Sequence, residues 1–156
     1  MNCSKALVLL FCMTITCAPL AQETVDTNIG STLPPRVRGL LIQEMNAILD
    51  ATLTILDALV RGQDEVVAQR AQAIHDSFVM EQEMTEADRE VLLSAVPDAF
   101  VEQDRAFHEL SSRLAEVARG GDVTQQQRVF AALLEACMVC HSQYAADRFP
   151  GFKDAE

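Results

Sequence analysis

Residues 41–59 read LIQEMNAILDATLTILDAL, and this stretch decides the fold class. Side chains that suit a buried seam recur there at spacings of 4, 3, 4, 3 and 4 residues, at Leu41, Met45, Ile48, Thr52, Ile55 and Leu59. A seam of this period, held for almost three heptads, is what one helix of a bundle presents to its neighbours. The stretch therefore predicts a long amphipathic helix that packs against other helices.

The rest of the chain continues the helical pattern. Gly62 ends the first helix, Asp64 starts a second, Pro97 starts a third, and Asp122 caps a fourth that Pro150 stops. Between residues 79 and 96 the pattern is irregular, although Thr85 begins a short helix-start signature. No alternating strand pattern is found. The sequence thus predicts an all-α fold, an antiparallel four-helix bundle.

The last helix carries Cys137-Met138-Val139-Cys140-His141, a C-x-x-C-H signature for covalent attachment of a c-type haem. The two thiols add across the haem vinyl groups as thioethers, and the adjacent imidazole reaches the iron from one face. A redox dithiol would need a thioredoxin-like strand context, and a zinc site would need a second ligand pair. The motif therefore predicts one covalent haem c per chain, with His141 as the proximal iron ligand.

The first 21 residues are typical of a secretory signal peptide. Lys5 supplies the positive start, and residues 6–13 form an apolar run too short to span a bilayer. Cleavage after Ala21 is expected, with lipidation at Cys17 as the alternative. Residues 22–32 are then a flexible leader, and residues 33–152 form the haem-binding bundle. Export agrees with the motif, because c-type haem is attached outside the bacterial cytoplasm, and we expect a periplasmic protein.

The mature chain is strongly acidic. After residue 21 it keeps 11 of the 12 basic residues and all 23 acidic ones, a formal charge of −12. Such a surface argues against binding to nucleic acid or to anionic membranes. The negative surface serves solubility, docking to a basic redox partner, or both, and net charge alone does not distinguish these roles.

The stretch CMVCHSQY at 137–144, on the last of four helices in an exported chain, resembles the cytochrome c-prime superfamily of class II c-type cytochromes. The resemblance covers residues 33–152. It implies that Tyr144 packs against the haem, since the family often has an aromatic residue three positions after the histidine. The chain departs from the family at Ala145, where many members have a basic residue, and Arg148 is the nearest substitute.

The resemblance also makes one position of the first helix decisive. Electron-transfer members place a methionine over the distal iron face, and gas-binding members place an apolar side chain there. Met45 lies on the inward seam and is the expected sixth iron ligand, against the alternative of an ordinary core methionine. A shift of one turn would put Leu41 or Ile42 over the iron instead. Met80 and Met84 are rival ligands near a helix end.

These residues predict a periplasmic electron carrier that cycles between Fe(III) and Fe(II) with His/Met-ligated haem; the alternative is a five-coordinate cytochrome that binds NO or CO. An enzyme is not expected, because peroxide chemistry needs polar distal groups and the seam around Met45 reads as apolar. The expected partner is a redox protein. A membrane span is not expected. Homodimerisation through the first two helices is open, with Ala47, Ala51 and Ala58 as small residues for close approach.

Two interpretations are open for each of four further side chains. His75 and His108 flank the inward positions, which favours surface residues with a carboxylate neighbour over iron ligation. Arg36 and Arg38, near the start of the first long helix, either approach the haem propionates or are solvated.

Overall fold

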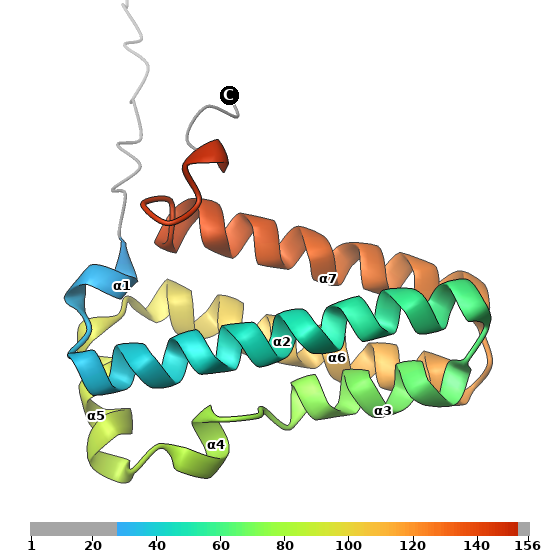
Figure 1. Ribbon diagram of the computed structural model, residues 1–156, viewed down its shortest axis with the longest axis horizontal. Helices are drawn as coiled ribbons and strands as arrows, with labels where there is room; N and C mark the ends of the chain where they lie inside the picture. Colours follow the sequence, from blue (N-terminus) through green and yellow to red (C-terminus); the bar gives the residue numbers. More distant parts are fainter. Residues whose placement is uncertain (1–27, 153–156) are drawn as a thin grey trace, which may run out of the picture.

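The computed structural model describes residues 28–152, which form a bundle of helices (Figure 1). In chain order the elements are α1 (Ile29–Thr32), α2 (Pro35–Arg61), α3 (Asp64–His75), α4 (Met80–Glu83), α5 (Glu86–Ala95), α6 (Asp98–Arg119), α7 (Val123–Tyr144) and a 3₁₀ turn, η1 (Pro150–Phe152). The described residues contain no strand. The four bundle helices are α2, α3, α6 and α7, and the all-α prediction is confirmed.

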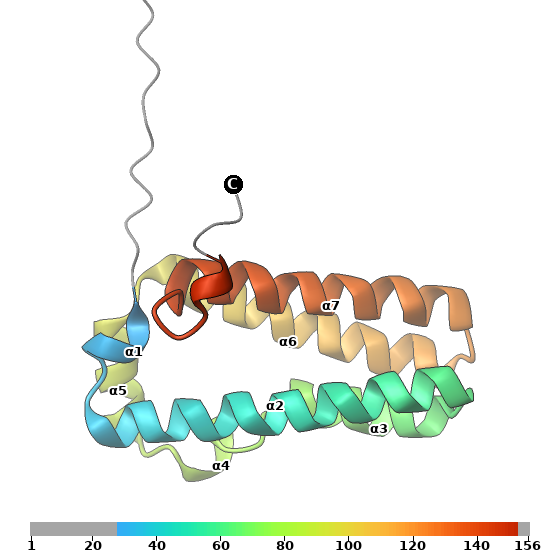
Figure 2. The same cartoon turned by 45° about the horizontal axis from the view of Figure 1, so that its top comes forward.

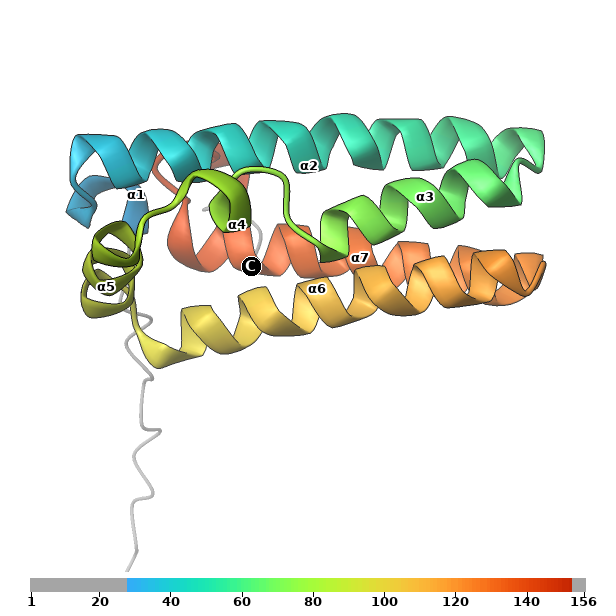
Figure 3. The same ribbon diagram turned by 90° about the horizontal axis from the view of Figure 1, so that it is seen from below.

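Short turns join the bundle helices at one end, and the smaller elements gather towards the other (Figures 1 and 2). The α2–α3 and α6–α7 turns lie together, whereas α1 and α5 lie beside the start of α2. Seen from below, α3 lies between α2 and α6, and α4 continues from α3 under α2 (Figure 3). Because α3 is short, α4 and α5 complete that side of the bundle.

Local sequence signals explain most helix boundaries. Gly62 ends α2 with φ of +67°, a left-handed conformation that glycine adopts without a Cβ clash. Thr85 and Asp88 form a reciprocal capping box at the start of α5. Asp122 accepts a hydrogen bond from the backbone N–H of Gln125 at 3.0 Å. These starts and stops were predicted from the sequence.

Two helix boundaries differ from the prediction. The sequence favours Ser31 or Thr32 as the cap of the first long helix, but Pro34 precedes α2, and both hydroxyl residues lie in the separate turn α1. At the other end, α7 stops at Tyr144 and not at Pro150, because Ala145 leaves the helical conformation with φ −143° and ψ 24°. The chain then turns back on itself, so residues 145–152 form a cap beside the end of α7.

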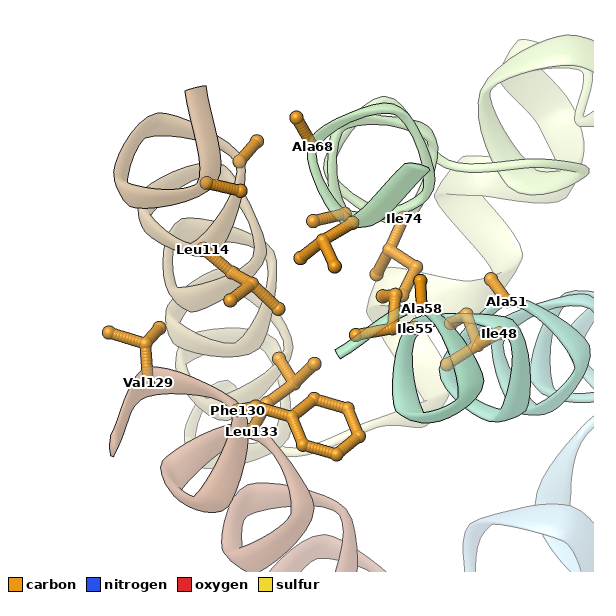
Figure 4. Close-up of a cluster of buried hydrophobic side chains, with 14 residues drawn as sticks. Ile48, Ala51, Ile55, Ala58, Ala68, Ile74, Leu114, Val129, Phe130 and Leu133 are labelled. Carbon is orange, nitrogen blue, oxygen red and sulfur yellow. The ribbon is translucent and has the colours of Figure 1, made fainter. Parts of the chain in front are cut away.

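The main core fills the end of the bundle where the turns lie (Figure 4). Its fully buried members come from all four helices: Ile55, Val67, Ala71, Ile74, Leu114, Ala115 and Leu133. Each large aliphatic side chain buried there contributes about 1.5–3 kcal/mol relative to exposure. The inward seam predicted for α2 is confirmed, with Ile48, Thr52 and Ile55 buried. This core leaves the opposite half of the bundle free to build a site.

A smaller cluster closes that opposite half. Ile29, Leu33, Val37 and Val96 are buried together there, so α1 packs against the start of α2 and the end of α5. The prediction of a flexible leader through residue 32 is therefore wrong for its last residues, because the buried side chain of Ile29 anchors α1. The signal peptide expected at residues 1–21 and the rest of the leader lie outside the described residues.

One described helix, α2, is long and apolar enough to cross a bilayer on length and composition alone. Its inward side chains lie in the two clusters of the bundle. Its outer face carries an exposed apolar row, the α2 stripe: Leu49, Leu53, Leu56 and Val60, between 49% and 81% exposed. The alanines expected to allow dimer contact do not form this row, because Ala51 and Ala58 are buried in the core.

Candidate functional site

The C-x-x-C-H residues lie on one side of α7, in its last two turns. Cys137, Cys140, His141 and Tyr144 occupy positions i, i+3, i+4 and i+7 of a continuous helix, and each is half-buried. Both cysteines are free thiols. The helix therefore presents two sulfurs and one imidazole from neighbouring turns of a single rigid element.

Burial sets the protonation of these groups. It raises the pKa of Cys140 to about 11, with a further rise from the charges of Asp104 and Cys137, and it also raises the pKa of Cys137. A neutral thiol is a poor metal ligand, because the thiolate is the form that binds a metal. Burial lowers the pKa of His141, so its imidazole is neutral near pH 7, which is the form that ligates iron.

A cavity of about 220 Å³ lies between α2, α4, α5 and α6. Leu41 and Met45 of α2 line it, and so do Met80 and Met84. Met45 is half-buried and packs against the main core. The structure therefore places all three candidate methionine ligands in the wall of one cavity, and the inward position predicted for Met45 is confirmed. Its ligation of iron stays a prediction.

Two contacts tie this cavity to the motif face of α7. Phe100 lines the cavity, and its ring packs edge-on against Tyr144 with centroids 5.3 Å apart and an interplanar angle of 89°. Asp104, one turn further along α6, also lines the cavity and acts electrostatically on Cys140. None of the four motif-face residues lines the cavity itself, and Phe100 and Asp104 are the residues that connect the two.

The cavity wall is more polar than the sequence suggested. Glu44 is 2% exposed, and its carboxylate accepts hydrogen bonds from the backbone N–H groups of Phe78, Val79 and Met80 at 2.6–3.2 Å. This contact holds the connection between α3 and α4 against α2. The expectation of apolar surroundings for Met45 is wrong, because a carboxylate one residue away in the chain also lines the cavity.

A second carboxylate enters the cavity from α6. Burial raises the pKa of Asp104, the electrostatic influence of His108 lowers that pKa, and the influence of Glu44 raises it further. Asp104 lies on the inward stripe of α6, four residues after Phe100 and seven before the buried Ser111. Neither Asp104 nor Glu44 was predicted from the sequence, and the signal that could have found them is an acidic residue at an inward position of each helix.

The two remaining histidines pair with each other's backbone. His75 Nδ1 lies 3.0 Å from the carbonyl oxygen of His108, and His108 Nδ1 lies 3.2 Å from that of His75. His108 Nε2 is also 3.8 Å from Asp104. The predicted carboxylate neighbour is present for His108. Both histidines also line the cavity, and the reciprocal contact joins α3 to α6.

The arginines near the start of α2 have protein partners. Arg36 donates to both carboxylate oxygens of Asp88 at 3.0 and 3.1 Å. Arg38 donates to the carbonyl oxygen of Leu33 at 2.8 Å. Neither arginine is simply solvated, and each ties α2 to a neighbouring segment.

The donor set on α7 fits a covalent haem. Two free cysteines one turn apart, an adjacent histidine and a nearby cavity lined by methionine and aromatic side chains match what a thioether-bound haem requires. Among the described residues no group of three or more His, Cys, Asp or Glu side chains could hold a metal ion, which argues against a zinc site. A four-helix bundle that carries this site places the protein among the c-type haem proteins.

Comparison with known protein families agrees with this class. The family described as Cytochrome C' matches residues 41–145, so the chain belongs to the cytochrome c' family. This family binds haem c, an iron-containing cofactor, covalently and typically once per chain. Comparison with curated proteins and with solved structures found no match. Members of the family are generally electron carriers or gas-binding haem proteins rather than enzymes.

Proposed function

We propose that this protein is a one-electron carrier whose haem, bound through Cys137 and Cys140, has His141 and Met45 as its two axial ligands. The observation that supports this role is the position of Met45, half-buried in the wall of the cavity that adjoins the motif face of α7. A c-type haem with a methionine ligand supplies reversible Fe(III)/Fe(II) chemistry at a raised potential.

The chain's own residues provide what such transfer needs. The α7 face anchors the cofactor at two sulfurs, and the Glu44 contact to residues 78–80 fixes the segment opposite it. The main core keeps α2 and α7 in register, which limits rearrangement between the two oxidation states. A buried iron with both axial positions filled also keeps small molecules away.

The proposal is tested by the ferric absorption spectrum. The haem-loaded protein is expected to show the methionine–iron charge-transfer band towards the red end of the visible spectrum, and Met45→Leu is expected to remove it. Met80→Leu and Met84→Leu are matched controls, because both side chains line the same cavity. Loss of the band in either control, with the band kept in Met45→Leu, would assign the sixth ligand to the rival methionine.

A five-coordinate, gas-binding haem is the second candidate. Its supporting observation is the cavity of about 220 Å³ beside Leu41 and Met45, which is large enough for a diatomic ligand. In that case Leu41 covers the iron, and Met45→Leu leaves the spectrum unchanged. Rapid binding of CO or NO by the reduced wild-type protein would favour this function over electron transfer.

We further propose a periplasmic location and a basic redox partner. The supporting features are the export signal read in the first 21 residues and the excess of acidic over basic residues in the remainder. Complementary charge speeds diffusional encounter and makes it sensitive to salt. The rate of electron exchange with a basic acceptor protein should therefore fall as ionic strength rises. A rate independent of salt contradicts the charge argument.

The α2 stripe is our candidate surface for a second copy of the chain. Its 4, 3, 4 spacing is that of a helix–helix seam. In an antiparallel pair centred between Leu53 and Leu56, Leu49 faces Val60 of the other copy. Leu56→Glu should leave a monomer in sedimentation experiments, whereas the exposed but outlying Val91→Glu should not. A wild-type monomer at high concentration refutes the dimer.

A further inference from the structure

The cap formed by residues 145–152 places an aromatic ring directly on the expected iron ligand. The rings of Phe149 and His141 are stacked, with centroids 4.5 Å apart and an interplanar angle of only 13°. This face-to-face contact is not a consequence of helix geometry, because Phe149 follows the end of α7 and reaches His141 only through the turn. The stack is therefore a specific product of the cap.

The cap is held in place by contacts at several points. The backbone N–H groups of Arg148 and Phe149 both donate to the carbonyl oxygen of Ala145, at 2.9 and 3.1 Å. The N–H of Asp147 donates to Asn28 Oδ1 at 3.1 Å, which joins the cap to the segment before α1. Phe152 packs edge-on against Phe149, with centroids 6.3 Å apart.

Stacking and iron binding use different parts of the imidazole. Phe149 covers a ring face, whereas coordination uses a nitrogen lone pair in the plane of the ring. Among residues 28–152 neither ring nitrogen of His141 has a hydrogen-bond partner. Metal-bound histidines are commonly oriented by a hydrogen bond to the second nitrogen. Here the stack with Phe149 is the orienting contact that the described residues provide.

We propose that Phe149 is a positioning residue for the haem iron: it fixes the plane of the His141 imidazole and keeps that ligand in place. This inference rests on His141 being the axial ligand, as proposed above. It does not depend on the sixth ligand. An aromatic pair of this kind contributes about 0.5–1.5 kcal/mol, so its loss should reduce the ratio of histidine-bound to histidine-free iron roughly 2- to 13-fold.

The test uses the haem-loaded full chain with Met45→Leu, Met80→Leu and Met84→Leu combined as background, because the cavity wall then offers the other iron face no methionine. Resonance Raman spectra of the reduced protein report the iron–histidine stretch. Phe149→Ala should shift and broaden this band, and the band intensity should fall with the fraction of iron that stays bound to the histidine. Phe149→Tyr should restore it, since a phenol ring stacks as well, and Leu56→Ala, an exposed apolar truncation on α2, should leave it unchanged.

The outcomes separate this inference from the proposed function. A normal parent band that stays unchanged in Phe149→Ala overturns the role of Phe149. Absence of the band in the parent with all three methionines replaced contradicts axial ligation by His141 instead. If Phe149→Ala unfolds, as checked by circular dichroism, Phe149→Leu keeps most of the apolar volume and loses the flat ring. The band must shift in that variant too, or the proposal fails.

Discussion

Replacement of Glu44 by glutamine should destabilise the protein more than any other single-atom exchange on α2. The carboxylate is buried and accepts from three backbone donors, those of Phe78, Val79 and Met80. Glutamine keeps one acceptor oxygen and replaces the other with an NH₂ donor. At least one of the three N–H groups then faces a donor and has no partner.

The expected size follows from that unpaired group. A buried donor without a partner costs about 1–3 kcal/mol, and the remaining bonds also weaken because the acceptor is no longer charged. We therefore expect Glu44→Gln to lower the free energy of unfolding by about 2–3 kcal/mol. For a domain of this size that loss lowers Tm by roughly 6–12 °C.

The assay is thermal and urea unfolding of the haem-loaded protein, followed by circular dichroism, with amide hydrogen exchange of residues 78–80. The matched control is Asp50→Asn, the same chemical exchange at an exposed acid on the same helix. Asp50→Asn should stay within about 0.5 kcal/mol of the wild type. If Glu44→Gln is equally mild and the three amides exchange no faster, the Glu44 contact does not hold the α3–α4 connection.

Three further predictions follow. Hydrogen bonds from Thr85, assisted by Arg36, hold the pKa of Asp88 below its usual value of 3.8. Asp88→Asn should therefore lower the free energy of unfolding at neutral pH, and its difference from the wild type should shrink as pH falls below about 4. A stability difference that stays constant with pH contradicts this. Leu114→Ala, fully buried in the core, should cost about 2–5 kcal/mol in urea unfolding. Replacing Cys137 and Cys140 together by serine should make the haem extractable with acidified acetone, and retained pigment would refute thioether attachment.

The fold was predictable because the deciding information is periodic. The seam from Leu41 to Leu59, the stop at Gly62 and the caps at Thr85 and Asp122 each act within a few residues, and the structure confirms them. The end of α7 was not predictable in this way. Residues 145–149 have no strong helix breaker before Pro150, and the helix stops where the cap packs against His141 and Asn28.

The site was predictable only in part, because a sequence pattern shows which residues share one helix face but not which distant segments pack together. The motif residues follow each other along α7, so their shared face was readable from spacing. The cavity that they adjoin brings together Glu44, Met80 and Asp104 from three segments distant in sequence. No local sequence pattern specifies that these three residues lie close together. The polar wall and the stacked Phe149 therefore became visible only with the chain folded.

We propose that Met45 occupies the iron face opposite His141, and one optical measurement is the strongest test of this ligation. Spectra of the reduced protein are recorded with and without carbon monoxide, for the wild type and for Met45→Leu. We expect little change in the wild type on addition of the gas, and ready formation of the CO adduct in Met45→Leu. Prompt and complete CO binding by the wild type, with Met45→Leu behaving identically, would contradict it.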